Sequence, residues 1–314
     1  MEELNLWFEK YRPKKLDDCI LSKKMKDIFQ GYIDKKEIPN LMLTGFQGTG
    51  KTTLAKVLVN ELNTESLFID CSTDSGKQMI QDQVVPFAST ISMGENNVPK
   101  IIICDESDGL NSSAQRSMRP IIEKYAINTR FIFTGNYVEK LIPALKSRCA
   151  CFNFSYNKSE MAEIMTAIFK RCKMILDDNG IKYEKKPLML FINKWYPDFR
   201  RIINELQSYA TGYGVIDEGI LSSATKEDIA DQLYPLILDQ DFKKCKEWVM
   251  NSIESAEDIF NALYIKMNDY IKPELQPNFI ILLAQYQEYS SHVMNQQINT
   301  MALITELMSA IDDK

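Results

Sequence analysis

The chain has 314 residues and a net charge of −6, with 45% hydrophobic and 25% charged residues. This length exceeds one ordinary core, so two or three domains are expected, and the composition is typical of a soluble globular protein. A single histidine argues against histidine-based catalysis, and seven cysteines without paired C-x-x-C spacing argue against a zinc module or a disulfide framework.

The charge is unevenly distributed along the chain. From residue 225 onward there are fifteen acids and seven lysines, so this part carries −8 and the first 224 residues carry +2. All eight arginines lie at or before Arg201, which indicates anion contacts there, with solvated surface arginines as the alternative. No apolar run approaches membrane-spanning length and the N-terminus lacks a signal-peptide pattern, so we expect a cytoplasmic protein without a membrane partner.

The first segment, Leu6 to Pro13, is predicted to be extended or a turn, because the residue before a proline avoids the α region. Trp7 and Tyr11 within it either cap a core or have another role. A helical stretch begins at Ser22, since apolar residues recur after it at spacings of three and four.

Residues 45–52 read G-F-Q-G-T-G-K-T and fit the phosphate-loop pattern G-x-x-x-x-G-K-[ST]. The apolar run Leu41–Leu43 precedes them as a predicted buried strand. Residues 53–59 continue as a predicted helix. This strand–loop–helix context distinguishes a phosphate loop from a chance match.

The chemistry of a phosphate loop requires these residue types. Gly45, Gly48 and Gly50 let the backbone curl so that its N–H groups face an anion. Lys51 can reach the β- and γ-phosphates as a point charge. Thr52 offers a hydroxyl to Mg²⁺ at the N-terminus of a helix, where the dipole favours negative charge.

A second strand is predicted at Ser66–Asp70, followed by a polar loop that opens a helix near Gln78. Such a helix start can hold a phosphate. An ordinary turn capped by Asp74 or Ser75 is equally compatible with the residues.

The run from Lys100 to Glu106 predicts a buried strand that ends in two adjacent carboxylates. In a doubly wound sheet, ligands sit at the carboxyl ends of the strands. Asp105 would hold Mg²⁺ there, directly or through water, and Glu106 would act as a general base on the attacking water. An acidic turn after a strand is the alternative.

A helix is predicted from Asn111 to Ala126, with a kink or a new first turn at Pro120. Another strand follows at Arg130–Thr134. Asn136 comes directly after it, and its amide either contacts the γ-phosphate or the attacking water, or caps the turn.

A short helix at Leu141–Lys146 and a strand at Cys151–Phe154 complete this part. Strand–loop–helix units therefore repeat from residue 40 to 154. This repetition predicts an α/β fold, a parallel sheet with helices on both faces.

After Tyr156 the periodicity becomes helical throughout. Asn157 and Glu160 form a predicted capping box for a helix that ends at residues 177–180. Further helices are predicted at 188–195 and from Asp198 onward. Arg200 lies in the first turn of the latter, where its charge opposes the helix dipole, so it is either a ligand contact or solvated.

From about residue 225 only helices are predicted. Their apolar residues form a core or pack on neighbouring subunits.

Several of these motifs together resemble the sliding-clamp-loader ATPases of the AAA+ class, over most of residues 5 to 212. Residues 7–13, W-F-E-K-Y-R-P, are similar to the opening motif that lies near the adenine in that family. Residues 105–108, D-E-S-D, resemble the Walker B box, and residues 134–136 resemble sensor 1. Ser147-Arg148-Cys149 is similar to the S-R-C motif of clamp loaders, and Asp198-Phe199-Arg200 resembles sensor 2, with Pro197 in place of glycine.

The resemblance implies a AAA+ nucleotide-binding domain at residues 1–155, a helical lid at 156–224 and a helical collar at 225–314. It implies ATP and Mg²⁺ as cofactors, with Thr52 and Asp105 on the metal and Glu106, Asn136 and Arg148 as catalytic residues, Arg148 acting in trans. The nucleotide contacts that it implies are Trp7, Tyr11, Arg12, Gly45, Gly48, Thr49, Gly50, Lys51, Thr52, Thr53 and Arg200.

The partners implied are a sliding clamp, primer–template DNA and other loader subunits in a five-membered ring. DNA contacts are expected near Ser75, Gly76 and Lys77. The compact size is most similar to the bacteriophage T4 type of large subunit. Two alternatives stay open: another AAA+ DNA motor, such as a helicase or helicase loader, and a nucleotide-bound scaffold that does not hydrolyse ATP.

Overall fold

The computed structural model describes residues 6–73, 76–90, 98–223, 229–252, 255–290 and 292–312. It divides into two compact units, Met1–Leu221 and Ser222–Lys314. The predicted boundary near residue 155 falls within the first unit, between the last strand of the main sheet and the helix that follows it. The division into three domains stays a prediction.

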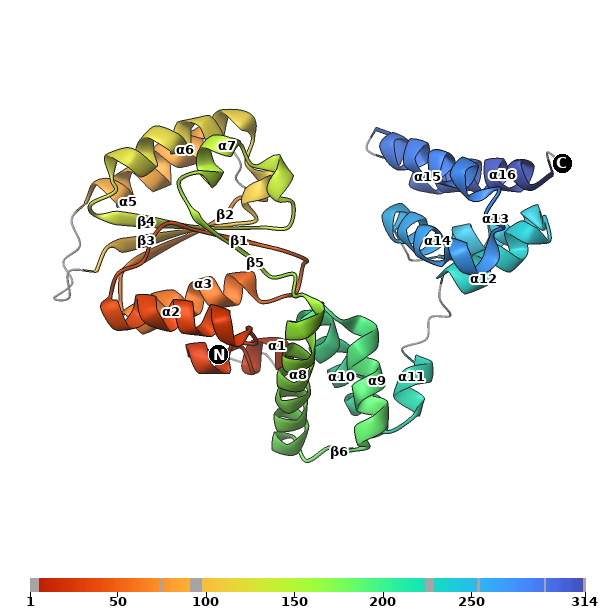
Figure 1. Ribbon diagram of the computed structural model, residues 1–314, viewed down its shortest axis with the longest axis horizontal. Coiled ribbons are helices and arrows are strands. Elements are labelled where there is room, and N and C mark those ends of the chain that lie inside the picture. The colour runs from red at the N-terminus through yellow and green to blue at the C-terminus, as the bar shows by residue number, and fades with distance from the viewer. Residues whose placement is uncertain are drawn as a thin grey trace. The chain divides into compact units, whose positions relative to one another are not determined.

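A five-stranded parallel sheet forms the centre of the first unit, in the order β2-β3-β4-β1-β5 (Figure 1). The predicted α/β sheet is thereby confirmed. The strands are β1 Leu41–Thr44, β2 Ser66–Asp70, β3 Lys100–Asp105, β4 Thr129–Gly135 and β5 Ala150–Asn153.

Helices cover both faces of this sheet (Figure 1). In the central strands successive side chains point to opposite faces, so Leu41 and Leu43 pack under α2 and α3 while Met42 packs on the other face with α6. The helices up to the end of the sheet are α1 Trp7–Lys10, α2 Lys23–Lys35, α3 Lys51–Leu62, α4 Lys77–Met79, α5 Val85–Ser89, α6 Ser112–Lys124 and α7 Pro143–Lys146.

The structure bears on two local predictions. The segment Leu6–Pro13, predicted to be extended or a turn, contains the one-turn helix α1, in which Trp7 is buried and its backbone N–H donates to Gln207 Oε1 at 2.8 Å. No new first turn begins at Pro120, because α6 runs through it from an Asn111 cap whose side chain accepts from the Ala114 N–H. The alternative, a kink at Pro120, stays a prediction.

Four helices and a small sheet follow β5, below the main sheet in Figure 1. The capping box of Asn157 and Glu160 is present at the start of the first of them. The elements are α8 Lys158–Asp178, β6 Lys182–Tyr183, α9 Lys185–Trp195, α10 Phe199–Tyr213, β7 Val215–Ile216 and α11 Gly219–Ser223, with β6 and β7 parallel.

The regular elements of the second unit, over the residues described, are all helices. Tyr234 is fully buried at its centre, and its hydroxyl donates to the Leu263 carbonyl at 2.5 Å. The helices are α12 Ile229–Leu238, α13 Phe242–Asn251, α14 Ala256–Tyr270, α15 Gln276–Ser290 and α16 Gln296–Asp312. Over the described ranges, no helix of either unit is long and apolar enough to span a membrane.

Candidate active site

The loop between β1 and α3 curls as the phosphate-loop pattern predicts, with positive φ at Gly45, Gly48 and Gly50. Gly48 cannot be replaced without a rearrangement. A Cβ at this position would lie 1.8 Å from Asp198 Oδ1, and its φ of +72° disfavours other residues. The Gly48 carbonyl also accepts the Phe199 N–H at 3.1 Å, so the start of α10 rests directly on the loop.

Lys51 is buried within this loop. Its ammonium donates to the carbonyls of Gly45 at 2.8 Å and Phe46 at 2.6 Å, and to Asn136 Oδ1 at 2.9 Å. Burial, with Arg200 nearby, lowers the pKa of Lys51 to about 8, against the opposing effect of three surrounding carboxylates. The predicted phosphate-binding lysine and the predicted sensor amide are thus in direct contact.

A chain of short hydrogen bonds joins α3 to the ends of β3 and β4. The Thr52 hydroxyl donates to Asp105 Oδ1 at 2.6 Å, and the Thr134 hydroxyl donates to the same oxygen at 2.6 Å. The Glu106 N–H donates back to Thr134 Oγ1 at 3.1 Å. Glu106 has φ +51° and ψ +44°, a left-handed conformation that costs about 1 kcal/mol or more for a residue with a side chain, and this bond helps to hold it.

Ser107 and Asp108, the last two residues of the segment that resembles the Walker B box, have clear structural roles. Ser107 is buried and donates to the Thr134 carbonyl at 2.7 Å. Asp108 Oδ2 accepts the backbone N–H groups of Asn136 at 3.2 Å and Tyr137 at 3.1 Å. Asp108 therefore fixes the loop that presents the Asn136 amide to Lys51.

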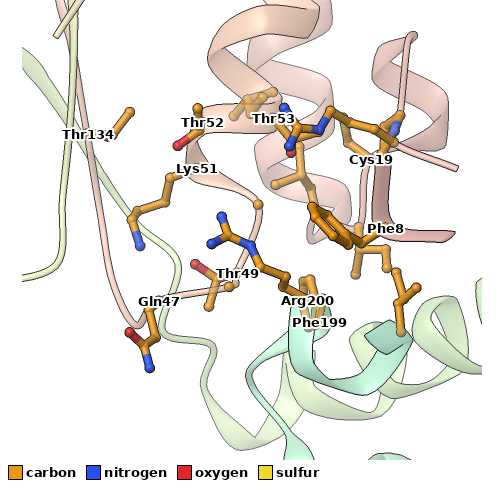
Figure 2. A pocket seen from close by; sticks show the side chains of 18 of the residues that line it. Phe8, Cys19, Gln47, Thr49, Lys51, Thr52, Thr53, Thr134, Phe199 and Arg200 are labelled. Carbon is orange, nitrogen blue, oxygen red and sulfur yellow. The ribbon is translucent and has the colours of Figure 1, made fainter. Parts of the chain in front are cut away.

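One cavity collects most of the predicted nucleotide contacts. Figure 2 shows Lys51, Gln47 and Thr134 at one end and Cys19 and Phe8 at the other. The predicted residues that line it are Tyr11, Arg12, Gly48, Thr49, Gly50, Lys51, Thr52, Thr53, Glu106, Asn136 and Arg200.

The N-terminal segment contributes to the cavity differently from the prediction. Trp7 does not line the cavity; it is buried and α1 packs against α10, whereas its neighbour Phe8 does line it. The Tyr11 ring lines the cavity while its hydroxyl donates to Asp178 Oδ2 at 2.5 Å, at the end of α8. Arg12 pairs with Glu9 at 2.5 Å.

Arg148 lies apart from this cavity, at the opposite edge of the sheet. It lies two residues before Ala150, the first residue of β5, which pairs with Leu41, the first residue of β1. The phosphate loop follows the other end of β1, four residues or roughly 13 Å away. Arg148 Nε donates to Glu123 Oε1 at 2.9 Å, and this bond lowers the pKa of Glu123.

The predicted DNA contacts are only partly described. Ser75 lies outside the described residues. Gly76 precedes α4, and Lys77 is exposed at its first position. Both stay predictions.

The donor set suits nucleotide with a hard cation. Thr52 and Asp105 offer only oxygen atoms, which Mg²⁺ prefers, and they lie where the 12-residue helix α3 begins. The backbone N–H groups of the loop and the positive end of α3 suit phosphate.

Several lining residues were not predicted. Ile20, Leu21, Phe199 and Ile203 form apolar wall, and Arg171 lines the cavity from α8. A single apolar residue in a sequence does not indicate whether it lines a cavity or packs in a core, so these four could not be predicted. Thr134 and Asp108 lie inside motifs that were recognised, so their positions were the only available signal.

Two family models match the chain. The model described as ATPase family associated with various cellular activities (AAA) matches residues 41–156. The model described as sliding-clamp-loader large subunit, AAA+ ATPase lid domain, matches residues 160–222.

Curated relatives match over nearly the whole chain. Replication factor C small subunit 1 of Pyrobaculum aerophilum is 33% identical, covering 98% of this chain and 95% of that protein. Probable replication factor C subunit 5 of Dictyostelium discoideum is 32% identical, covering 84% and 76%. Among solved structures, the Thermotoga maritima RuvB Holliday junction branch migration motor has a TM-score of 0.56 at 19% identity, covering 81% of this chain and 85% of that one. At this identity the likeness shows the fold alone.

Proposed function

The chain belongs to the replication factor C small-subunit family of AAA+ clamp-loader ATPases. We propose that ATP binding and hydrolysis at its site drive the loading of a sliding clamp onto DNA. ATP binding closes an assembly that holds an opened sliding clamp around primer–template DNA. Hydrolysis then releases the clamp on the DNA. The observation that carries this proposal is the meeting of Lys51, Thr52, Glu106 and Asn136 on one cavity that the lid also lines.

The residues of the cavity divide the work of phosphoryl transfer. Lys51 exchanges its carbonyl partners for the β- and γ-phosphates. Asn136, held by Asp108, orients the attacking water, and the Glu106 carboxylate takes its proton. Arg200, at the first turn of α10, brings the lid to the phosphates.

Mg²⁺ would be held by Thr52 and Asp105, where it neutralises developing charge on the phosphates. Thr134 fixes the Asp105 carboxylate through the second hydroxyl on the same oxygen. This chain therefore sets the orientation of its metal-binding carboxylate before nucleotide arrives.

Arg148 acts on the nucleotide of an adjacent subunit. Its place at the far edge of the sheet supports this role, because the side chain is separated from its own cavity by the length of β1. Such a head-to-tail contact closes into a ring, for which five members are proposed. A lone chain is then a weak ATPase.

The partners are a sliding clamp, primer–template DNA and further loader subunits, acting in the cytoplasm. DNA would be bound through its phosphates near Gly76 and Lys77. The large-subunit assignment is supported by the lid model, whose description names a large subunit. The bacteriophage type stays a proposal, and the relatives reported above are archaeal and eukaryotic.

The test is ATP hydrolysis by the chain with its loader subunits, with and without clamp and primer–template DNA. Stimulation that requires both establishes clamp loading. Glu106→Gln should bind ATP normally and remove turnover. Activity that follows DNA but ignores the clamp would instead favour a helicase-type motor.

A further inference from the structure

Arg171 lies in the middle of lid helix α8 and lines the same cavity as the phosphate loop. It was not part of any recognised motif. Its guanidinium donates to the Asp18 carbonyl at 3.1 Å. Among the ion pairs of the described residues none includes Arg171, so this cation faces the cavity without a carboxylate to neutralise it.

Two arginines of the lid therefore serve two ends of one cavity. Arg200 lies close enough to Lys51 to contribute to lowering its pKa, at the end of the cavity where the phosphates are proposed to bind. Arg171 lies close to Cys19, at the end that Figure 2 shows away from Lys51. Triphosphate bound at Lys51 would leave its nucleoside part toward Cys19.

The wall at the Cys19 end is apolar. Ile20 and Leu21 follow Cys19 in the segment after the first 3-10 turn, and Phe8 of α1 lies at the same end in Figure 2. A flat base suits such a wall. A guanidinium plane can stack on the face of an aromatic ring, and its five N–H groups can donate to polar atoms at the ring edge or on the ribose. It can therefore bind both parts of a nucleoside.

The bond from Arg171 to Asp18 also links the lid to the body of the first unit. Asp18 ends the turn Leu16–Asp18, which is anchored to α3 by the Leu16 N–H on Glu61 Oε1 at 3.2 Å. Lys26 Nζ holds the neighbouring Asp17 carbonyl at 2.8 Å. A ligand that contacts Arg171 is therefore connected both to α8 and, through the Asp18 carbonyl, to this anchored turn.

We propose that Arg171 is a second nucleotide-binding arginine, which contacts the base and ribose of ATP and ADP alike and holds α8 against the Asp18 turn. This inference rests on the proposed function, since it requires that nucleotide occupies the cavity. It assigns phosphate recognition to the loop with Arg200 and nucleoside recognition to Arg171.

The experiment compares Arg171→Ala with Lys170→Ala, an exposed neighbour on the same helix that does not line the cavity. Affinities of the full chain for ADP, ATP and inorganic tripolyphosphate are measured by calorimetry. Arg171→Ala should weaken ADP and ATP equally, by about tenfold, and leave tripolyphosphate unchanged. Lys170→Ala should match the wild type for all three.

Arg171→Lys removes the planar guanidinium but keeps the positive charge, so it distinguishes the contribution of stacking from that of charge. It should remain weakened for ADP, because an ammonium does not stack as a guanidinium does. Thermal unfolding of the nucleotide-free variants should stay within about 2 °C of the wild type. A large loss of stability with normal ADP binding would make Arg171 structural and overturn the inference.

The remaining outcomes are distinct. Equal ADP affinity of Arg171→Ala and wild type overturns the inference alone. A loss confined to ATP, or shared by tripolyphosphate, places Arg171 on phosphate and overturns it too. A wild-type chain that binds neither ATP nor ADP would refute the proposed function itself.

Discussion

The ammonium of Lys51 lies 2.9 Å from the amide oxygen of Asn136, so side chains that follow two neighbouring strands meet at the carboxyl edge of the sheet. Parallel pairing of β1 with β4 brings this about, because Thr44 pairs with Gly135 and the next residues emerge side by side. We expect the γ-phosphate of bound ATP to contact Lys51. Binding of ATP therefore has to exchange this hydrogen bond for phosphate contacts.

Nucleotide affinity should fall as the pH rises above about 8. Lys51 has a pKa lowered to about 8 in the free protein, chiefly by burial, and bound phosphates raise it again. Above pH 8 the free lysine is neutral, so binding takes up a proton and Kd rises by up to about tenfold per pH unit. Calorimetry with ADP from pH 7.5 to 9.5 measures this slope.

The comparison for this prediction is Lys51→Arg. A guanidinium stays charged throughout the range, so its ADP affinity is expected to be lower overall but independent of pH. If Lys51→Arg shows the same slope as the wild type, the titrating group is not Lys51.

Thr134→Val should lower ATP turnover by about 10–100-fold with little effect on ATP binding. Valine keeps the shape but removes the hydroxyl that fixes Asp105 Oδ1 and accepts the Glu106 N–H. Steady-state hydrolysis in the reconstituted complex checks this. Thr134→Ser keeps the hydroxyl and should recover most of the activity; failure to recover would point to packing instead.

Gly48→Ala should cost about 1–2 kcal/mol of unfolding free energy, measured by urea denaturation. The new methyl would lie 1.8 Å from Asp198 Oδ1, which caps α10, so the lid helix must move away from the loop. Gly50→Ala is the matched control. Gly50 also has positive φ, but no heavy atom lies within 4 Å of its Cβ position. Equal losses in both variants would mean that the lid contact contributes nothing.

Arg148→Ala should remove stimulated ATP turnover, by a factor of roughly 10³–10⁵, and leave ATP binding by the same chain intact. ATP binding should be unaffected because Arg148 does not line the nucleotide cavity of its own chain. Lys146→Ala, two residues away on α7, should retain turnover. Loss of ATP binding by the isolated Arg148→Ala chain would contradict a role in trans.

The sheet and the phosphate loop were predictable because their signals are local. Buried strands read as short apolar runs, and the loop needs glycines followed by lysine and threonine. The same holds for Asp105 and Glu106, whose site follows from the rule that strand ends gather at one edge.

The features that sequence did not reveal depend on contacts between distant residues. Trp7 enters a helical turn because it packs against α10, some 200 positions along the chain. Arg171 faces the cavity because of how α8 is rotated against the Asp18 turn, and the pattern of an amphipathic helix does not fix that rotation.

Loading of the clamp itself tests the central claim most directly. A labelled sliding clamp is incubated with circular primed DNA, ATP and the loader assembled with this chain, and the clamp retained on DNA is counted. The account predicts clamp retained on DNA and free of the loader with the wild-type chain and ATP. With Glu106→Gln the clamp should stay bound together with the loader, and without a primer no clamp should be retained. Retention that is independent of ATP, or strand separation without any clamp retained, would contradict it.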